Sequence, residues 1–438
     1  MALFRQMERQ DRTQHEAELL WERIFSRANL FMALARVQDN KGAPGIDGMT
    51  VEDLPDHLRQ HWLGIRAKLD KGTYVPSPVK RVEIPKPGGG VRKLGIPTVL
   101  DRLIQQAIHQ VLSPVFEPTF STHSYGFRPG RSAHDAVKAA RDYVETGFQY
   151  VVDIDLEKFF DTVNHDRLRA RLATVITDKR VLQLINAYLK AGVMIDGLVT
   201  ATEEGTPQGG PLSPLLSNIV LTELDQELER RGLRFARYAD DCNVYVKSQK
   251  AADRVLMSLT WFIEHRLRLK VNRAKSAADE VSKRAFLGFC FYQAPTGRWG
   301  IRINPASLKR LRSKIRTLTR RHQGNSLEAI RDQLNSLIIG WVNYYGLSDD
   351  ESVMRSLDCW LRRRMRQICW IQWKTVHQRI QRLLELGGSE KWAIPSGSSQ
   401  KGAWRLAKSK SMHMALNNRY WFDFGLKSFV QQFQLRHT

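Results

Sequence analysis

The sequence predicts a mixed α/β (α+β) fold up to about residue 303, followed by a region made only of helices. Strand-like and helix-like apolar patterns interleave in the first part, whereas every apolar pattern from 304 to 369 has helical spacing. The third observation is charge, because 68 Lys and Arg against 45 Asp and Glu give +23 over 438 residues. Such an excess repels itself in a compact chain and is commonly offset by a polyanion, so nucleic acid is the expected partner.

The first elements follow from local patterns. Residues 1–75 are predicted to be helical, with polar breaks at 40–48. Residues 79–97 are predicted to form a hairpin, because two β-rich arms surround the turn sequence KPGGG. A long amphipathic helix is expected next, since apolar residues recur at helical spacing from 103 to 112.

Two acidic motifs follow. YVVDIDLEKFF (150–160) is predicted to open as a strand, with Asp153 and Asp155 on one face. TPQGGPLSP opens a predicted helix over 206–230. FARYADDCNVYVK (235–247) is predicted to be a second hairpin, with Asp240 and Asp241 at its tip.

The helical region is strongly basic. Two of its three apolar stripes have basic opposite faces, and no acid occurs between 305 and 321. A run of charge is usually a solvated face, but solvated faces normally mix signs. A three-helix domain that grips phosphates is therefore favoured, and residues 389–438, rich in Lys, Ser, Trp and Tyr, are a candidate further binding element.

Other classes are disfavoured. No run approaches the ~18 apolar residues that span a bilayer, so no membrane partner is expected. The four cysteines form no Cys-x-x-Cys pair and have no paired histidines nearby, which argues against a zinc site and a disulfide framework. We expect a soluble protein in a reducing, cytoplasmic compartment.

The aspartates suggest a metal site. Phosphoryl transfer to a nucleotide uses two Mg²⁺ ions, which prefer carboxylate oxygens. Aspartates are also common in turns for conformational reasons alone. Here apolar arms flank Asp240 and Asp241, and a buried hairpin does not tolerate paired carboxylates without a metal or another cation.

An ordered set of motifs resembles the reverse transcriptase–maturase encoded by group II introns. The motifs are IPKPGGGVR, YGFRPGRSAHDAV, DLEKFFD, TPQGGPLSPLLSNI, YADD, RLKVNRAKS and FLGF. The resemblance covers nearly the whole chain and implies a right-hand polymerase with fingers and palm, an all-helical thumb and a small C-terminal DNA-binding region. The short ending looks most like the compact bacterial class C subgroup, which lacks an endonuclease domain.

The resemblance assigns catalytic and metal-binding roles to Asp155, Asp240 and Asp241, holding two Mg²⁺ ions. The family's spacing of Asp, four residues, then an aromatic selects Asp155 with Phe160 as the steric gate against ribonucleotides. The same spacing from Asp153 ends on Lys158, so Asp153 is not expected to be a ligand. Strand alternation leaves only one of Phe159 and Phe160 facing the nucleotide, and Phe159 is expected in the core.

Further roles follow from the matched motifs. Lys86, Arg92 and Gln208 are expected to bind the nucleotide, although each could also be a solvent-facing turn residue. Arg128 and Arg131 are expected to contact the template, in a segment that also looks like a helix capped by Ser132. Leu287 and Gly288 match the primer grip, or plain strand packing. The expected RNA-binding cations are Lys309, Arg310, Arg312, Lys314, Arg316, Arg363 and Arg364.

The implied domains are 1–75 (N-terminal extension and start of fingers), 76–303 (fingers and palm), 304–375 (thumb, or maturase X domain) and 376–438 (C-terminal DNA-binding region). The expected partners are group II intron RNA, an RNA template with a DNA primer, a DNA target and dNTPs, in a nucleoid-associated ribonucleoprotein. Two alternatives stay open: a host-adopted relative in DNA repair or phage defence, and a non-catalytic RNA-binding maturase.

Overall fold

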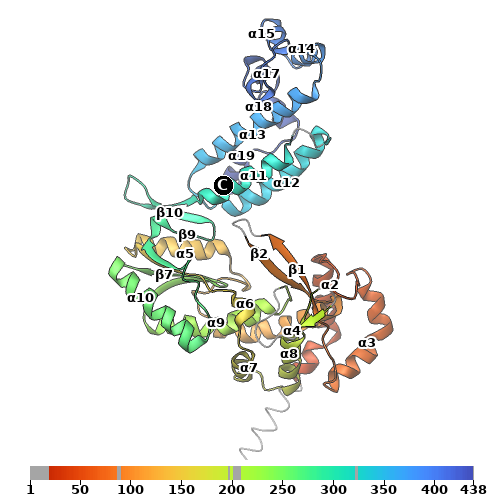
Figure 1. Ribbon diagram of the computed structural model, residues 1–438, viewed down its shortest axis with the longest axis vertical. Coiled ribbons are helices and arrows are strands. Elements are labelled where there is room, and N and C mark those ends of the chain that lie inside the picture. Colours follow the sequence, from red (N-terminus) through yellow and green to blue (C-terminus); the bar gives the residue numbers. More distant parts are fainter. Residues whose placement is uncertain (1–18, 86–89, 196–197, 201–208, 321–323, 438) are drawn as a thin grey trace, which may run out of the picture. The chain divides into compact units, whose positions relative to one another are not determined.

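The computed structural model describes most of the chain (Figure 1). The described residues are 19–85, 90–195, 198–200, 209–320 and 324–437. The chain divides into two compact units, Met1–Glu280 and Val281–Thr438. Within the described residues, none of the helices combines the length and the apolar composition needed to cross a lipid bilayer.

In the first unit, helices and strands interleave as the sequence predicts. Its α-helices are α2 (Arg27–Asp39), α3 (Leu54–Asp70), α4 (Val99–Phe116), α5 (Ala133–Glu145), α6 (Phe159–Thr162), α7 (His165–Ala173), α8 (Lys179–Lys190), α9 (Ser213–Arg230) and α10 (Gln249–Trp261). Its strands are β1 (Val79–Pro85), β2 (Val91–Ile96), β3 (Tyr150–Ile154), β4 (Val193–Ile195), β5 (Leu198–Thr200), β6 (Arg234–Tyr238), β7 (Asp241–Val246) and β8 (Ala277–Glu280).

Side-chain caps explain where several of these helices begin. Ser132 and Asp135 form a reciprocal capping box at the start of α5, so the predicted cap at Ser132 is confirmed. The hydroxyl of Thr98 caps the N-terminus of α4, and the hydroxyl of Ser248 caps the N-terminus of α10. These contacts satisfy backbone N–H groups that a helix cannot satisfy internally.

Both predicted hairpins are present. Strands β1 and β2 pair antiparallel and belong to a sheet with the order β2-β1-β4-β5. Strands β6 and β7 pair antiparallel in a second sheet, called the central sheet, with the order β6-β7-β3-β8. Helices α5, α9 and α10 pack against strands of the central sheet. This sheet carries the acidic motifs.

One large apolar core holds the first unit together. Helix α4 is buried over most of its length, as its apolar residues between 103 and 112 predict. The β6–β7 hairpin contributes Phe235 and Val244, both fully buried. Burial of such side chains contributes about 1.5–3 kcal/mol each, which fixes the hairpin within the protein.

The second unit begins with a small antiparallel sheet and continues as helices. Its sheet has the order β11-β10-β9, from β9 (Ala285–Phe286), β10 (Phe289–Gln293) and β11 (Trp299–Ile303). Its helices are α11 (Pro305–Leu318), α12 (Leu327–Tyr345), α13 (Glu351–Gln372), α14 (Val376–Glu385), α15 (Glu390–Gly397), α16 (Ala403–Leu406), α17 (Lys410–Ala415), α18 (Asn418–Asp423) and α19 (Phe429–Gln434).

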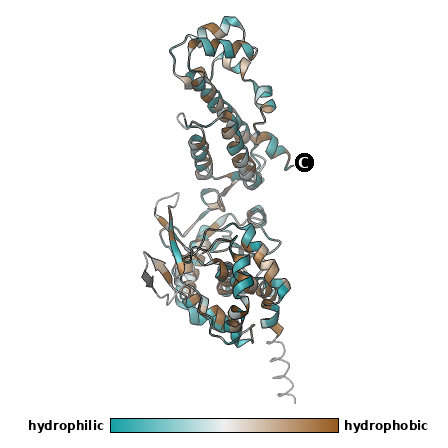
Figure 2. Cartoon of the chain, turned by 90° about the vertical axis from the view of Figure 1, so that its right-hand side faces the viewer, coloured by the Kyte–Doolittle hydropathy of each residue, from teal (hydrophilic) through white to brown (hydrophobic). Residues whose placement is uncertain are grey.

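The helices of the second unit share a separate core. Residues of all three predicted apolar stripes, among them Leu311, Leu334 and Leu361, are buried in it. Figure 2 shows hydrophobic and hydrophilic residues alternating along these helices. The basic face of α11 is thereby left toward solvent, where it can meet a polyanion.

Candidate active site

The acidic hairpin ends in a two-residue turn. Tyr238 pairs with Asp241 across the hairpin, so Ala239 and Asp240 form the loop. Ala239 has a φ of 57°, in the left-handed region that costs a residue with a Cβ roughly 1–2 kcal/mol. A strained residue persists only where its surroundings hold it, and such residues cluster at functional sites.

The central sheet brings Asp155 beside this turn. Strand β3 pairs with β7 up to Ile154 opposite Cys242, so the next residues along each chain, Asp155 and Asp241, are neighbours. Opposed residues in an antiparallel pair have Cα atoms roughly 4.5–5.5 Å apart. Asp153, two residues before Asp155, also lies near enough to raise the pKa of Asp241. The strand itself ends one residue before Asp155.

The carboxylates around the turn affect the pKa of Asp241. Surrounding protein desolvates Asp241, and the negative charges of Asp240, Asp153 and Asp155 add to that effect, raising the pKa of Asp241 to about 6. Asp241 is nevertheless open to solvent. The four carboxylates therefore form a concentrated negative site that remains accessible, and a cation would be bound there favourably.

Lys275 is the cation that the structure places at this site. Its Nζ lies 3.1 Å from Asp155 Oδ2, and its charge lowers the pKa of Asp241. In the described part of the chain, no group of three His, Cys, Asp or Glu side chains is arranged closely enough to hold a metal ion as it stands. The donor chemistry of Asp155, Asp240 and Asp241 still fits Mg²⁺, which prefers carboxylate oxygens.

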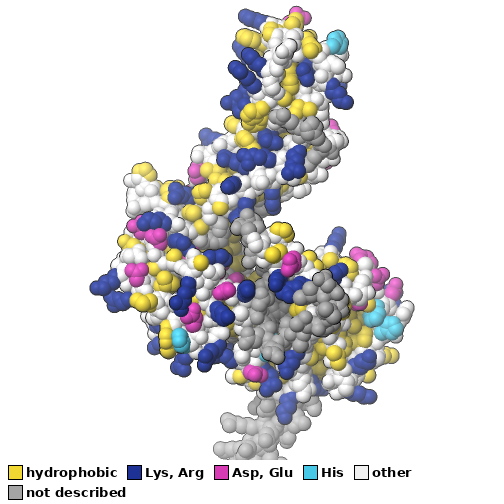
Figure 3. Space-filling view, viewed as in Figure 1, with side chains coloured by type: hydrophobic (Ala, Val, Ile, Leu, Met, Phe, Trp, Pro, Cys, Tyr) yellow, Lys and Arg dark blue, Asp and Glu magenta, His cyan; other side chains and the backbone are white. Residues whose placement is uncertain are grey.

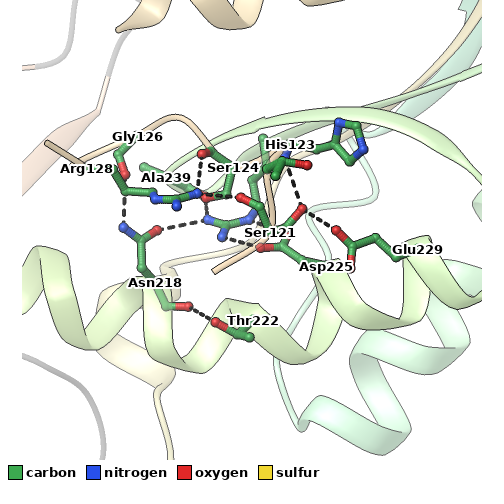
Figure 4. Close-up of polar contacts among 12 residues, drawn as sticks. Ser121, His123, Ser124, Gly126, Arg128, Asn218, Thr222, Asp225, Glu229 and Ala239 are labelled. Carbon is green, nitrogen blue, oxygen red and sulfur yellow. Dashed lines mark hydrogen bonds and ion pairs between the residues drawn. The ribbon is translucent and has the colours of Figure 1, made fainter. Parts of the chain in front are cut away.

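A buried arginine, Arg237, is bonded to the acidic turn, and Figure 4 shows its partners Asp225, Asn218 and Ala239. Arg237 is completely buried, and its Nε and Nη2 each donate to Asp225 of α9 at 2.6 Å. Its Nη1 donates to the backbone carbonyl of Ala239 at 2.9 Å and to Asn218 Oδ1 at 3.1 Å. Burial alone would lower the pKa of Arg237, but Asp225 outweighs burial and raises it. The turn is thus bonded to a rigid helix.

Gly126 approaches the same turn closely. A Cβ at this position would lie 2.3 Å from the backbone nitrogen of Ala239, a distance that no side chain could tolerate without moving the backbone. Asn218 donates to the Gly126 carbonyl at 2.9 Å, so one amide side chain bonds both Gly126 and Arg237. Neither Gly126 nor Arg237 was singled out by the sequence analysis. The one available signal was that Arg237 is a charged residue inside an apolar arm of the hairpin.

Arg128 supports this arrangement from within the protein. Its guanidinium is buried and makes four hydrogen bonds, to Glu117 and to the carbonyls of Ser121 and Ser124. The segment that it binds pairs with β6 at Ser124. A side chain so enclosed positions its own loop, and the expected template contact by Arg128 stays a prediction. Arg131 is half-buried and donates to the Thr122 carbonyl at 2.6 Å.

Phe159 and Phe160 lie in a helical turn, α6. The expected strand alternation was therefore wrong as a reason for separating their roles, because the strand ends at Ile154 and Lys158 turns the chain with a φ of 48°. Phe159 is 2% exposed and belongs to the core. Phe160 is half-buried, packs on the edge of that core, and its ring centroid lies 5.3 Å from that of Phe159.

The expected nucleotide-binding residues fall largely in parts of the chain outside the described residues. Lys86 and Gln208 both lie there. The backbone of Arg92 pairs with Ile84 in the β1–β2 hairpin, while its side chain is outside the described part. Their roles stay predictions.

In the second unit, Leu287 and Gly288 form the turn between β9 and β10. Both have positive φ, 50° and 84°. Tyr344 donates to the Leu287 carbonyl at 2.8 Å, and a Cβ on Gly288 would lie 2.9 Å from the Tyr345 hydroxyl. Helix α12 therefore holds this turn tightly, and its expected role as primer grip stays a prediction.

The expected RNA-binding cations divide into two groups. The cations on α11 are exposed, except for Arg312, which is half-buried: Lys309, Arg310, Arg312, Lys314 and Arg316. On α13, Arg363 stacks over Trp404 at 3.7 Å and Arg364 donates to Thr319 Oγ1 at 2.6 Å, so both guanidiniums are fixed in place. Figure 3 shows Lys and Arg side chains spread over the face of this unit that it draws, with few carboxylates among them.

Two family matches cover most of these features. Residues 84–291 match the family described as "Reverse transcriptase (RNA-dependent DNA polymerase)". Residues 308–385 match the one described as "Group II intron, maturase-specific domain". The first match contains Asp155, Asp240 and Asp241, and the second contains the basic helices.

Curated relatives agree with both matches. Protein YkfC of Escherichia coli is 34% identical over 310 residues, which are 61% of this chain and 80% of YkfC. The group II intron-encoded protein LtrA of Lactococcus lactis is 38% identical over 209 residues, 47% of this chain. The matched part spans only 34% of LtrA. The chain belongs to the family of group II intron reverse transcriptase–maturases, and its enzymatic class is RNA-directed DNA polymerase.

Proposed function

We propose that Asp155, Asp240 and Asp241 form the polymerase centre at which this chain copies RNA into DNA. The observation that supports this most is the register of the central sheet, which makes Asp155 and Asp241 neighbours beside the Asp240 turn. Two Mg²⁺ ions bound there would supply charge stabilisation to the attacking and leaving oxygens. The buried Arg237–Asp225 pair holds the turn, and Lys275 holds Asp155.

Around this centre, Lys86, Arg92 and Gln208 are proposed to bind the incoming dNTP, and Phe160 to close the space beside its ribose. The proposed template and primer contacts are Arg128, Arg131, Leu287 and Gly288, with Arg128 acting through the loop that it holds. Residues 76–303 would then be fingers and palm, 304–375 the thumb, and 376–438 a region that binds the DNA target.

The proposed RNA partner is group II intron RNA, bound as by a maturase. The support is the basic surface of α11, whose exposed cations lie within the match to the maturase-specific domain. Cations that neutralise phosphates release counterions, which favours binding without sequence specificity. The chemistry of splicing would remain with the RNA.

Primer extension tests the proposal. The purified chain should extend a DNA primer along a long structured RNA when dNTPs and Mg²⁺ are present, and should stop when the metal is chelated. Failure to extend on an RNA template to which the chain demonstrably binds would contradict the polymerase assignment.

Replacing Phe160 with Ala should relax the discrimination against ribonucleotides. Removal of the ring opens space for a 2′-hydroxyl, and differences of this size in an apolar pocket change selectivity by roughly 10- to 200-fold. The measurement is the ratio of rNTP to dNTP incorporation efficiency. Phe159→Leu is the matched control: it lies in the core, so it should lower stability and leave the ratio unchanged. An unchanged ratio in Phe160→Ala would remove the gate role.

RNA affinity should fall steeply with salt. A protein making 6–10 phosphate contacts loses about 10³–10⁵ in affinity between 50 and 200 mM salt. Filter binding or anisotropy across that range measures the slope, and replacing Lys309 and Lys314 with Gln should make it shallower by about two. A flat dependence would mean that the α11 cations do not contact the RNA.

A further inference from the structure

A cavity in the second unit carries positive charge that the polymerase centre does not use. Its volume is about 370 Å³, which lies near the lower end of the usual range for ligand sites, roughly 300–1,000 Å³. The cavity is here called the Arg–Trp pocket and is lined by Arg316, Thr319, Arg320, Arg364, Gln367 and Trp404. These residues come from α11 and its end, from α13 and from α16.

The pocket is strongly cationic. Three of its lining residues are arginines and none is an acid. Among the residues that the structure describes, no carboxylate forms an ion pair with Arg316 or Arg320. Guanidinium groups left close together without acids repel one another, and that repulsion is relieved when an anion enters. Guanidinium forks match phosphate oxygens in particular.

The pocket is also ordered in advance. Arg364 donates from Nε to Thr319 Oγ1 at 2.6 Å and from Nη2 to the Thr319 carbonyl at 3.0 Å. Arg316 and Arg364 each lie 5.7 Å from the ring centroid of Trp360. Because these contacts restrict the side chains, less conformational entropy is lost when a phosphate binds.

Trp404 adds an aromatic wall. It is half-buried, and Arg363 lies 3.7 Å from its ring centroid while donating to its backbone carbonyl at 2.9 Å. The ring is thus held in one orientation at the edge of the cationic cavity. Aromatic rings beside cationic grooves stack the bases of single strands, whereas bases inside a duplex already stack on their neighbours.

We propose that the Arg–Trp pocket binds one unpaired nucleotide of a bound nucleic acid strand. The phosphate contacts Arg316, Arg320 and Arg364, and the base lies against Trp404. The site rests on the proposed function, because it presumes a nucleic acid partner, but it shares no residue with the acidic centre of the first unit.

A base-removal experiment tests the pocket. The ligands are fluorescent RNA hairpins that contain one bulged adenosine, the same bulge as an abasic residue, or no bulge, together with the three DNA equivalents. Stacking on an aromatic side chain changes affinity by roughly 5- to 150-fold per base. The full chain should therefore bind the adenosine bulge tighter than the abasic bulge by a factor in this range. A preference in the RNA series, the DNA series or both identifies the strand that enters.

Substitutions of pocket residues test whether the preference for the adenosine bulge depends on the Arg–Trp pocket. Trp404→Leu should bind the two bulges equally, while Trp404→Phe keeps the aromatic ring and should keep the preference. Arg320→Gln should weaken binding of both bulges and lower the salt slope by about one. Arg298→Gln is the matched control in the second unit: Arg298 is exposed and does not line the pocket, so both affinities should stay nearly unchanged and the adenosine preference should persist.

The outcomes are separable. Equal binding of adenosine and abasic bulges by the unmodified chain, or an undiminished preference in Trp404→Leu, would overturn the proposal. Because each preference is a ratio within one variant, a general loss of affinity does not mimic it. The preference should survive in Asp240→Asn, so failure of the polymerase proposal and failure of the pocket proposal give different results.

Discussion

Asp240→Asn should abolish cDNA synthesis while leaving RNA affinity nearly unchanged. Asparagine has almost the same size as aspartate, so the change removes a negative charge from the turn and little else. Loss of one electrostatic contact that stabilises a transition state costs roughly 10²–10³ in rate, and a metal ligand should cost at least that much. The rate of single-nucleotide primer extension measures the effect, with filter binding to the same RNA alongside.

The matched control is Asp253→Asn, which makes the same chemical change at an exposed position on α10. It should retain full activity. Normal extension by Asp240→Asn would refute the metal assignment, whereas parallel loss of RNA binding would mean that the turn also contributes to the nucleic acid grip.

Arg237→Met should both destabilise the protein and slow nucleotide addition. Removing one partner of a buried ion pair leaves the other charge uncompensated and typically costs about 3–5 kcal/mol. Arg237 also donates to the Ala239 carbonyl, so its loss frees a strained turn to move away from Asp155. Urea denaturation should show the lower free energy of unfolding, and extension assays on the folded fraction should show a lower maximal rate with nearly unchanged template affinity.

Arg230→Ala is the comparison for that variant. Arg230 also pairs with a carboxylate of α9, Glu227, but it is 71% exposed. Exposed pairs contribute about 0–1 kcal/mol, so its stability and its rate should stay near those of the unmodified chain. If Arg237→Met retained the full extension rate at a temperature where it is folded, Arg237 would have no part in positioning the acidic turn.

Much of the fold follows from local patterns. The two hairpins, the cap at Ser132 and the apolar stripes of α11, α12 and α13 depend on neighbouring residues alone, and the structure confirms them. Contacts between segments that are distant in the sequence could not be predicted from these local patterns. The partner of Arg237 is on a different element, and the close approach of Gly126 to Ala239 joins segments more than a hundred residues apart.

Two expectations show where pattern reasoning stops. Strand alternation was extended past Ile154, although Lys158 turns the chain into α6, so Phe159 and Phe160 differ in burial for reasons of packing. Arg128 was assigned to the template from its motif, yet tertiary contacts with Glu117 bury it. The sequence alone does not show whether the charged group of a basic residue contacts solvent, a ligand or another side chain inside the protein.

Metal-directed cleavage tests the central claim most directly. With added hydrogen peroxide and ascorbate, Fe²⁺ bound in place of Mg²⁺ produces hydroxyl radicals that cut the backbone near its ligands. The fragments can be mapped by mass spectrometry. Shared coordination predicts cuts near both Asp155 and the Ala239–Asp241 turn, lost together in Asp240→Asn. Cuts confined to one of the two segments, or cuts near Asp155 that persist in Asp240→Asn, would contradict a common metal centre.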